Sequence, residues 1–179
     1  IGLDIPTFWN GLSKSISGAA PITRFDSSKF KTHFACELKN FNPEDYINKK
    51  ELRKLDDFSV YALISTEEAI KDSKLDLETI NLKRCGVIWG SGIGGLSTMS
   101  SEIESYVLND KTPRFSPFFI PKMISDIAAG LLSIKYGFRG PNFSTVSACA
   151  SSTNSIIEAY HYIKLGKSDV MISGGSEAS

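Results

Sequence analysis

The sequence predicts an α/β fold in which a mostly parallel sheet is covered by helices on both faces. Short continuous apolar runs at 85–90 and 169–175 are typical of strands buried on both sides. Segments with helical spacing of apolar residues separate these runs, and such alternation indicates parallel crossover units. Ligands of these sheets bind at the carboxyl ends of the strands, so the loops that follow the strands are the first places to look for a site.

The first part of the chain predicts mainly helix. Residues 4–15 are expected to form a short helix, and 27–43 alternate weakly enough to hold one exposed strand or hairpin. Proline and two acids at 43–45 suit the first turn of a short helix. The run 49–73 has one continuous apolar side and predicts a single long amphipathic helix.

The second part alternates strands and helices. The strand at 85–90 leads into a glycine turn, and 96–108 is predicted as a helix. Three prolines within 112–121 predict irregular structure there, and 122–136 predicts another helix that ends at Gly137. An apolar strand is then expected to run up to Cys149.

Cys149 is the candidate nucleophile. The preceding segment contains Phe143 and Val146, which favour a strand, and helical spacing begins at Ser155. At such a junction a cysteine faces the unpaired amides and the positive dipole of a helix, which favour the reactive thiolate. A small buried hydrophobic role is the alternative that the local pattern leaves open.

Composition excludes several functional classes. Twenty basic and twenty acidic residues cancel, which gives no indication of nucleic acid or an anionic membrane as partner. No apolar run approaches the roughly 20 residues of a membrane span. Three widely separated cysteines, Cys36, Cys85 and Cys149, fit a reducing, cytoplasmic compartment and indicate neither a disulfide framework nor a metal site.

The glycines at 90, 92 and 95 spell the dinucleotide-binding fingerprint after a strand. That fingerprint requires an acidic residue at the tip of a second strand, about 20 positions further on. Asp110 lies at that distance, but in a polar loop with no strand between Gly95 and Pro113. We therefore favour a turn that needs glycine for close backbone approach, and we expect no cofactor.

A nucleophilic cysteine usually works with a histidine. His161 lies twelve residues after Cys149, roughly 18 Å away along a helix that rises about 1.5 Å per residue. His33 lies in a polar region and is not an obvious partner. Either Cys149 is not catalytic, or its partners belong to sequence beyond this chain. Since the chain opens without methionine and stops directly after a strand, we expect it to be part of a longer protein.

Five segments, in this order, resemble the amino-terminal half of the β-ketoacyl-[acyl-carrier-protein] synthases, in particular the elongating type II condensing enzymes with a two-histidine active site. They are KELRKLDDF at 50–58, GVIWGSGIGG at 86–95, RFSPFFIPKMI at 114–124, YGFRGPNFSTVSACASS at 136–152 and DVMISGGSEA at 169–178. The resemblance covers residues 1–179. It implies a thiolase-like fold, of which this chain is the first αβα half without its first strand and without the carboxyl-terminal half.

The resemblance also implies roles for individual residues. Cys149 matches the nucleophile that takes an acyl chain from a carrier protein, and its amide matches an oxyanion-hole donor. Ile93 and Phe119 match the wall of the acyl pocket, and Phe119 would reach into the partner subunit of a homodimer. Ala148 matches a small residue beside that pocket.

Four basic residues match the surface that docks the acidic acyl carrier protein. They are Lys50, Arg53, Lys54 and Arg114. Without the resemblance, each is equally well explained as a solvated surface charge.

The implied reaction is a decarboxylative Claisen condensation in fatty-acid biosynthesis. The cysteine holds the acyl chain as a thioester, and malonyl carrier protein loses carbon dioxide and attacks it, which extends the chain by two carbons. The family uses two histidines and a lysine from the carboxyl-terminal half, so this chain alone is expected to be inactive. The resemblance implies no metal, nucleotide or flavin.

Several alternatives remain. A chain-length factor is the non-catalytic relative, but it typically replaces the cysteine, often with glutamine. A ketosynthase of a polyketide or other specialised pathway would use the same chemistry. A thiolase would use coenzyme A and should lack the segment RFSPFFIP, and a dinucleotide-binding domain would rest on the glycine turn alone.

Overall fold

The computed structural model describes residues 1–178. It divides into two compact units, Ile1–Pro43 and Glu44–Ser179, which are described separately. In the first unit, helix α1 (Ile5–Ser13) begins where the Asp4 carboxylate accepts a hydrogen bond from the Thr7 amide at 2.8 Å. Strands β1 (Ala20–Pro21) and β2 (Phe34–Ala35) form a short antiparallel pair. The predicted short helix and the predicted exposed strand are therefore confirmed.

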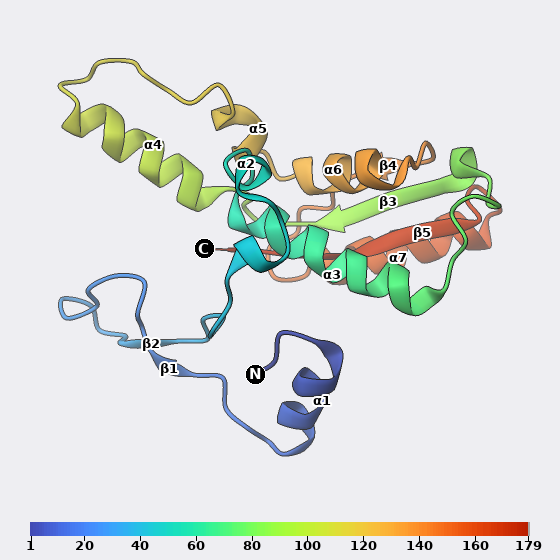
Figure 1. Ribbon diagram of the computed structural model, residues 1–179, viewed down its shortest axis with the longest axis horizontal. Coiled ribbons are helices and arrows are strands. Elements are labelled where there is room, and N and C mark those ends of the chain that lie inside the picture. The colour runs from blue at the N-terminus through green and yellow to red at the C-terminus, as the bar shows by residue number, and fades with distance from the viewer. Residues whose placement is uncertain (179) are drawn as a thin grey trace. The chain divides into compact units, whose positions relative to one another are not determined.

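The second unit is built on a parallel sheet of order β4–β3–β5 (Figure 1). Its strands are β3 (Cys85–Gly90), β4 (Asn142–Phe143) and β5 (Val170–Gly175). In register, Cys85 lies opposite Val170 and Gly90 opposite Gly175. The carboxyl ends of β3 and β5 therefore meet at one edge of the sheet.

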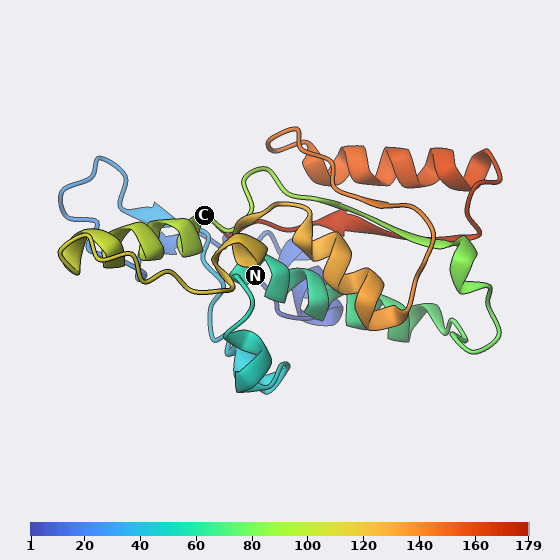
Figure 2. The same ribbon diagram turned by 90° about the horizontal axis from the view of Figure 1, so that it is seen from above.

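Helices cover both faces of this sheet, as predicted (Figure 2). On one face lie α3 (Asp57–Ser73) and α6 (Ile127–Tyr136), and on the other lies α7 (Ser151–Lys164). The core between the sheet and the α3/α6 layer is apolar. Its buried members include Phe58, Ala62, Leu63, Val87, Ala128, Ala129, Leu132, Phe138 and Ile172.

Helix α7 packs on the sheet through small residues. Ser151, Ser155 and Ala159 are buried, and a Cβ added to Gly90 would lie 2.4 Å from the carbonyl group of Ser151. The helix can therefore approach the strands closely only because these positions are small. The large apolar residues whose spacing indicated the helix lie elsewhere on it and are 45–58% exposed: Ile156, Ile157, Tyr160 and Ile163.

The predicted helix at 49–73 is interrupted, and the prediction of one continuous helix was wrong. The chain forms the 3₁₀ turn η1 (Pro43–Asp45), then α2 (Lys49–Leu52), and resumes helix at α3. The buried Asp56 carboxylate caps α3 through the Phe58 amide and also accepts from the Thr98 amide at 3.1 Å and hydroxyl at 2.6 Å. This tertiary contact overrides the helical periodicity of the sequence.

Two further boundaries differ from the prediction. The helix predicted at 122–136 is divided into α5 (Phe119–Met123) and α6, because Ile124 is extended. The strand predicted to reach Cys149 ends at Phe143, and the chain continues as a loop to α7. The remaining elements are η2 (Leu82–Arg84) and α4 (Leu96–Leu108), the latter as predicted. Gly137 ends α6 in the left-handed conformation with φ of 69°, which favours glycine.

Candidate active site

Cys149 lies on a tight elbow in the loop that joins β4 to α7. The residue before it, Ala148, has a left-handed backbone with φ of 49°, an uncommon conformation for a residue with a Cβ. Its surroundings hold it there. The buried Ser151 hydroxyl donates to the Ala148 carbonyl at 2.7 Å and accepts from the Ser147 amide at 2.9 Å.

Two more hydrogen bonds fix the same elbow. The Thr145 hydroxyl donates to the Ser151 carbonyl at 2.8 Å, and the Asn154 side chain donates to the Ser147 hydroxyl at 2.6 Å. Because every one of these bonds closes within the loop or onto the first turn of α7, the elbow is tied to the helix. Strained backbone held by its surroundings in this way is often found at functional sites.

The Cys149 side chain is exposed at the amino-terminal end of α7, which begins two positions later at Ser151. The alternative of a small buried hydrophobic residue is therefore wrong for Cys149. Cys85 is the buried cysteine, and burial raises the pKa of its thiol, which makes it a poor nucleophile. Among residues 1–178, no partner accepts a hydrogen bond from the Cys149 amide, so that amide can donate to a ligand.

The glycine turn after β3 is anchored by a residue from the end of the chain. One carboxylate oxygen of Glu177 accepts from the Gly92 amide at 2.7 Å and the Ile93 amide at 2.9 Å. The other accepts from the Gly94 amide at 3.2 Å, which also donates to the Ser91 hydroxyl at 3.1 Å. In a dinucleotide site such amides face a pyrophosphate, whereas here they are bonded to the protein's own carboxylate.

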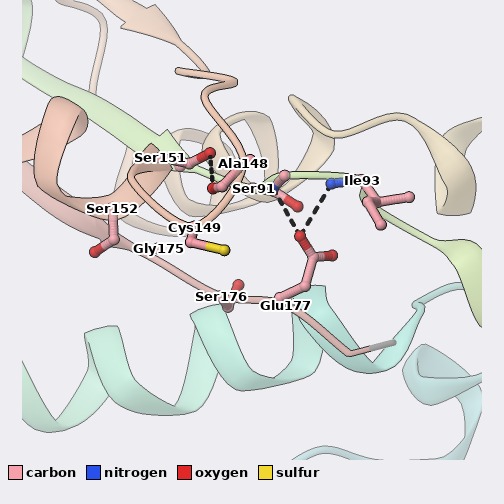
Figure 3. Close-up of a pocket in the computed structure, with 11 residues that line it drawn as sticks. Ser91, Ile93, Ala148, Cys149, Ser151, Ser152, Gly175, Ser176 and Glu177 are labelled. Atoms are coloured by element: carbon pink, nitrogen blue, oxygen red, sulfur yellow. Dashed lines mark hydrogen bonds between the residues drawn. The ribbon is translucent and has the colours of Figure 1, made fainter.

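The elbow and the glycine turn line one cavity of about 470 Å³ (Figure 3). Cys149, Ala148 and Ile93 lie on it together with Glu177, and the Cys149 sulfur points toward the side where Glu177 lies. Three residues that we expected from the resemblance are therefore brought together. Sequence reasoning missed Ser151 and Glu177, although the position of Glu177 just after a strand at the same sheet edge was a usable signal.

Phe119 does not line this cavity. It lies on α5, half-buried, with its ring stacked on Phe115 at a centroid distance of 5.7 Å. A neighbouring cavity of about 700 Å³ is lined by Ile93 together with Met99, Met123 and Val146. Ile93 therefore borders both cavities.

The four basic residues of the expected docking surface are all exposed. Lys50 is on α2, Arg53 and Lys54 lie in the break between α2 and α3, and Arg114 precedes α5. The Lys54 ammonium lies 5.6 Å from the centre of the Phe118 ring, which brings it close to the segment that carries Arg114. Their exposure is compatible with docking, and their role stays a prediction.

His161, which follows Cys149 on α7, does not line the cavity, and His33 belongs to the other compact unit. In the part of the chain that the structure describes, no group of three or more histidine, cysteine or acidic side chains could hold a metal ion. Over the same residues, no helix is long and apolar enough to cross a membrane.

Comparison with known proteins identifies the family. The family model described as "Beta-ketoacyl synthase, N-terminal domain" matches residues 1–179. The chain is 49% identical to 3-oxoacyl-[acyl-carrier-protein] synthase 2 of Staphylococcus aureus over 99% of its own length and 44% of that protein. It is 40% identical to the protein of the same name from Synechocystis sp., over 100% of this chain and 43% of that protein.

Solved structures agree. The ishigamide ketosynthase/chain length factor matches with a TM-score of 0.88 over 100% of this chain and 45% of its own, at 24% identity, which supports the fold. A type II PKS ketosynthase, solved in complex with its acyl-carrier protein, matches with a TM-score of 0.73 and 28% identity over 79% of this chain and 40% of its own. The chain thus spans about 44% of the length of the curated relatives it matches. It has the thiolase-like fold of the ketosynthases, and it belongs to the β-ketoacyl synthase family.

Proposed function

We propose that this chain is the amino-terminal half of a β-ketoacyl-[acyl-carrier-protein] synthase that elongates acyl chains in fatty-acid biosynthesis. The observation that carries the proposal is the exposed Cys149 on a hydrogen-bonded elbow, at the end of a helix and beside a cavity. The 49% identity to a 3-oxoacyl-[acyl-carrier-protein] synthase supports the same chemistry.

In the first proposed step, the Cys149 thiolate attacks the carbonyl carbon of an acyl thioester on the carrier protein. A carbon–sulfur bond forms, and negative charge develops on the carbonyl oxygen. The Cys149 amide has no other acceptor among the described residues and would stabilise that charge. The carrier's phosphopantetheine thiolate then leaves and takes up a proton, and the acyl chain remains on Cys149.

In the second proposed step, malonyl carrier protein loses carbon dioxide, and the resulting carbanion attacks the Cys149 thioester. The new carbon–carbon bond forms as the cysteine thiolate leaves, so the enzyme is regenerated and the product is longer by two carbons. The two histidines and the lysine that assist decarboxylation would come from the carboxyl-terminal half. On this proposal, residues 1–179 alone are inactive.

The exposed side of α7 supports a second half of the protein. Large apolar side chains on a helix normally face a core. Ile156, Ile157, Tyr160 and Ile163 are about half exposed here, and we propose that the carboxyl-terminal half covers them. We likewise propose that the first strand of the family fold completes the first αβα half.

The acyl pocket and the partners are also proposals. We infer that Ile93, Ala148 and Phe119 form the acyl pocket, with Phe119 contributed across the interface of a homodimer. Acyl- and malonyl-carrier proteins would dock on Lys50, Arg53, Lys54 and Arg114, because basic side chains steer and orient an acidic partner. A similar ketosynthase has been solved in complex with an acyl-carrier protein, which supports this partner. The proposed location is the cytoplasm.

The alternatives are less well supported. A chain-length factor would not need a cysteine at position 149. A ketosynthase of a specialised pathway would carry out the same condensation on another carrier protein. A thiolase would prefer coenzyme A, and a dinucleotide site would require the glycine-turn amides that Glu177 occupies.

The test is a turnover assay on the full-length protein with acyl and malonyl carrier proteins. We expect a β-ketoacyl carrier product longer by two carbons, together with release of carbon dioxide. Cys149→Ala should abolish it, while the matched variant Cys36→Ala, which changes the other exposed cysteine, should leave it unchanged. Efficient turnover with acyl-coenzyme A instead of carrier substrates would favour a thiolase, and no condensation with either donor would favour the non-catalytic relative.

A further inference from the structure

The glycine turn after β3 carries Ile93 at the edge of the cavity. The Glu177 carboxylate accepts hydrogen bonds from the amides in the middle of this turn. Within residues 1–178, the amides of Gly92 and Ile93 donate only to the Glu177 carboxylate, at 2.7 and 2.9 Å. The Gly94 amide shares its bond between Glu177 and Ser91. Three consecutive amides thus donate to one carboxylate, which lies more than eighty residues later in the sequence.

Glu177 itself projects from a fixed segment. The Ser176 hydroxyl before it accepts from the Trp89 indole at 2.9 Å and donates to the Phe58 carbonyl at 2.7 Å. Ala178 after it is buried, and its carbonyl accepts from the Ser97 hydroxyl at 3.3 Å. The carboxylate is therefore held from both sides, while the turn that it holds has left-handed geometry at Gly94, with φ of 85°.

Ile93 depends on this anchor. Its side chain is 57% exposed, so packing against described neighbours does little to fix it, and its amide donates to no described residue other than Glu177. The same side chain borders the cavity that contains Cys149 and the neighbouring cavity. A small displacement of the turn would therefore change the shape of the space available next to the cysteine.

We propose that Glu177 is a positioning residue, which fixes the glycine turn so that Ile93 sets which acyl chains reach Cys149. This inference rests on the proposed function, since it concerns the selectivity of the same site. In this role Glu177 acts through the turn, since both of its carboxylate oxygens accept hydrogen bonds from the turn amides. Hydrogen bonds to a charged carboxylate are stronger than those to a neutral oxygen, which explains why an acid suits this position.

The variants Glu177→Gln and Glu177→Ala remove some and all of these hydrogen bonds, respectively. Glutamine keeps one carbonyl oxygen, which can still accept from Gly92 and Ile93, but its amide group cannot accept from Gly94. Alanine removes all three bonds. Glu104→Gln is the matched control, because Glu104 is an exposed glutamate on α4, and the hydrogen bonds of the turn amides within residues 1–178 go to Glu177 and Ser91 instead.

Two readouts on the full-length protein test the proposal. Amide hydrogen exchange at Gly92 and Ile93 should accelerate on the order of tenfold in Glu177→Ala and less in Glu177→Gln. The ratio of Cys149 acylation rates for a short and a long acyl carrier donor should shift on the order of tenfold in the alanine variant. Alkylation of Cys149 by iodoacetamide, which is too small to require the Ile93 wall, should stay within about twofold.

The possible outcomes distinguish a failure of the proposed function from a failure of the proposed role of Glu177. Wild-type protein that accepts no acyl chain from either donor overturns the proposed function, and the selectivity claim with it. Wild-type protein that becomes acylated, while both Glu177 variants keep its acylation ratio and its exchange rates, overturns the role of Glu177 alone. Equal losses of acylation and alkylation in the alanine variant, without a change of ratio, would show a purely structural residue and also contradict the proposal.

Discussion

The two faces of the β4–β3–β5 sheet differ in what packs against them. On the α3/α6 face the buried side chains are large and apolar, such as Phe58 and Leu132, both 0% exposed. On the α7 face the helix buries only small side chains, namely Ser151, Ser155 and Ala159, and they pack against a strand surface that contains Gly90 beside the buried Ile88. The first face supplies hydrophobic stabilisation, in proportion to the apolar area it removes from water.

On the α7 face the backbone of the helix lies close to the backbone of strands β3 and β5. Close approach lets the Ser155 hydroxyl donate to the Gly174 carbonyl at 2.6 Å, and it sets the first turn of α7 against Gly90. The elbow that carries Cys149 is continuous with that turn. One face therefore holds the fold together and the other sets the position of the candidate nucleophile, so variants on the two faces should fail in different ways.

The largest effect on stability is expected from Leu132→Ala on the α3/α6 face. Removing a fully buried leucine side chain leaves a cavity and should lower the free energy of unfolding of the full-length protein by about 2–5 kcal/mol. The rate of Cys149 alkylation under native conditions should not change. Chemical denaturation and mass spectrometry of the alkylated peptide measure the two.

Ile134→Ala is the matched control, since Ile134 lies on the same helix and is 80% exposed. It should cost less than about 0.5 kcal/mol. Leu132→Ala protein could also lose Cys149 reactivity under conditions where all molecules are folded. That result would contradict our assignment of stability to the α3/α6 face and of Cys149 positioning to the α7 face.

The next effect is expected from Gly90→Ala on the α7 face. The new Cβ would lie 2.4 Å from the Ser151 carbonyl group, which is backbone and cannot move without the helix. We expect a loss of about 1–3 kcal/mol in the free energy of unfolding. Here Cys149 alkylation should change as well, because the displaced helix carries the elbow.

Gly130→Ala controls for the same substitution in a different place. Nothing lies within 4 Å of a Cβ at this position in α6, so alanine should stabilise the protein by about 0.4–1 kcal/mol. If Gly90→Ala were as well tolerated as Gly130→Ala, close packing of α7 on β3 would not be required.

A smaller effect is expected from Ser155→Ala. The variant leaves the Gly174 carbonyl without its hydroxyl donor and should cost about 1 kcal/mol, measured by chemical denaturation. Ser65→Ala removes an exposed hydroxyl that bonds only within α3, and it should change stability by less than about 0.5 kcal/mol. Equal values for both serines would remove the argument that polar contacts organise the α7 face.

The smallest effect concerns an ion pair at the outer edge of the α3/α6 layer. Hydrogen bonds from Lys135 and Lys71 lower the pKa of Glu67 from 4.5 to about 2. Because the folded-state pKa is depressed, this stabilisation is present above about pH 4.5 and is lost as the pH falls toward 2. Since the Glu67 side chain is 44% exposed, Glu67→Gln should cost no more than about 1 kcal/mol at neutral pH and low salt.

Denaturation of wild-type protein and Glu67→Gln across this pH range measures the difference. It should shrink as the pH falls from 4.5 toward 2 and should also shrink with added salt. A difference that persists at the acidic end would show that Glu67 contributes through packing rather than through its charge.

The fold class could be predicted because it depends on local patterns. Apolar runs and helical spacing locate β3, β5 and α4 correctly, and these elements alternate as a parallel sheet requires. The prediction of one long helix at 49–73 was wrong because α2 ends at Leu52 and Asp56 begins a second helix, held there by a contact with Thr98 that no local pattern contains. The apolar spacing of α7 indicated a helix but not that its small residues face the sheet.

The candidate site was predicted only in part for the same reason. Cys149 stood out locally because it precedes a helix, and the glycine turn stood out because of its composition. The hydroxyl of Ser151 and the carboxylate of Glu177 act through the tertiary fold, and Glu177 reaches a turn that is far away in sequence. Such contacts become visible only when the strand ends are placed side by side.

The role of Cys149 as acyl acceptor is tested most directly by mapping the acyl adduct on the full-length protein after brief incubation with an acyl carrier protein thioester. Peptide mass spectrometry would compare Cys36, which is exposed, Cys85, which is buried, and Cys149 on the elbow. We expect a thioester adduct on Cys149 and none on the other two cysteines, and we expect this adduct to be lost in Cys149→Ala. An adduct distributed equally over Cys36 and Cys149, or absent from Cys149 with a competent donor, would contradict this role of Cys149.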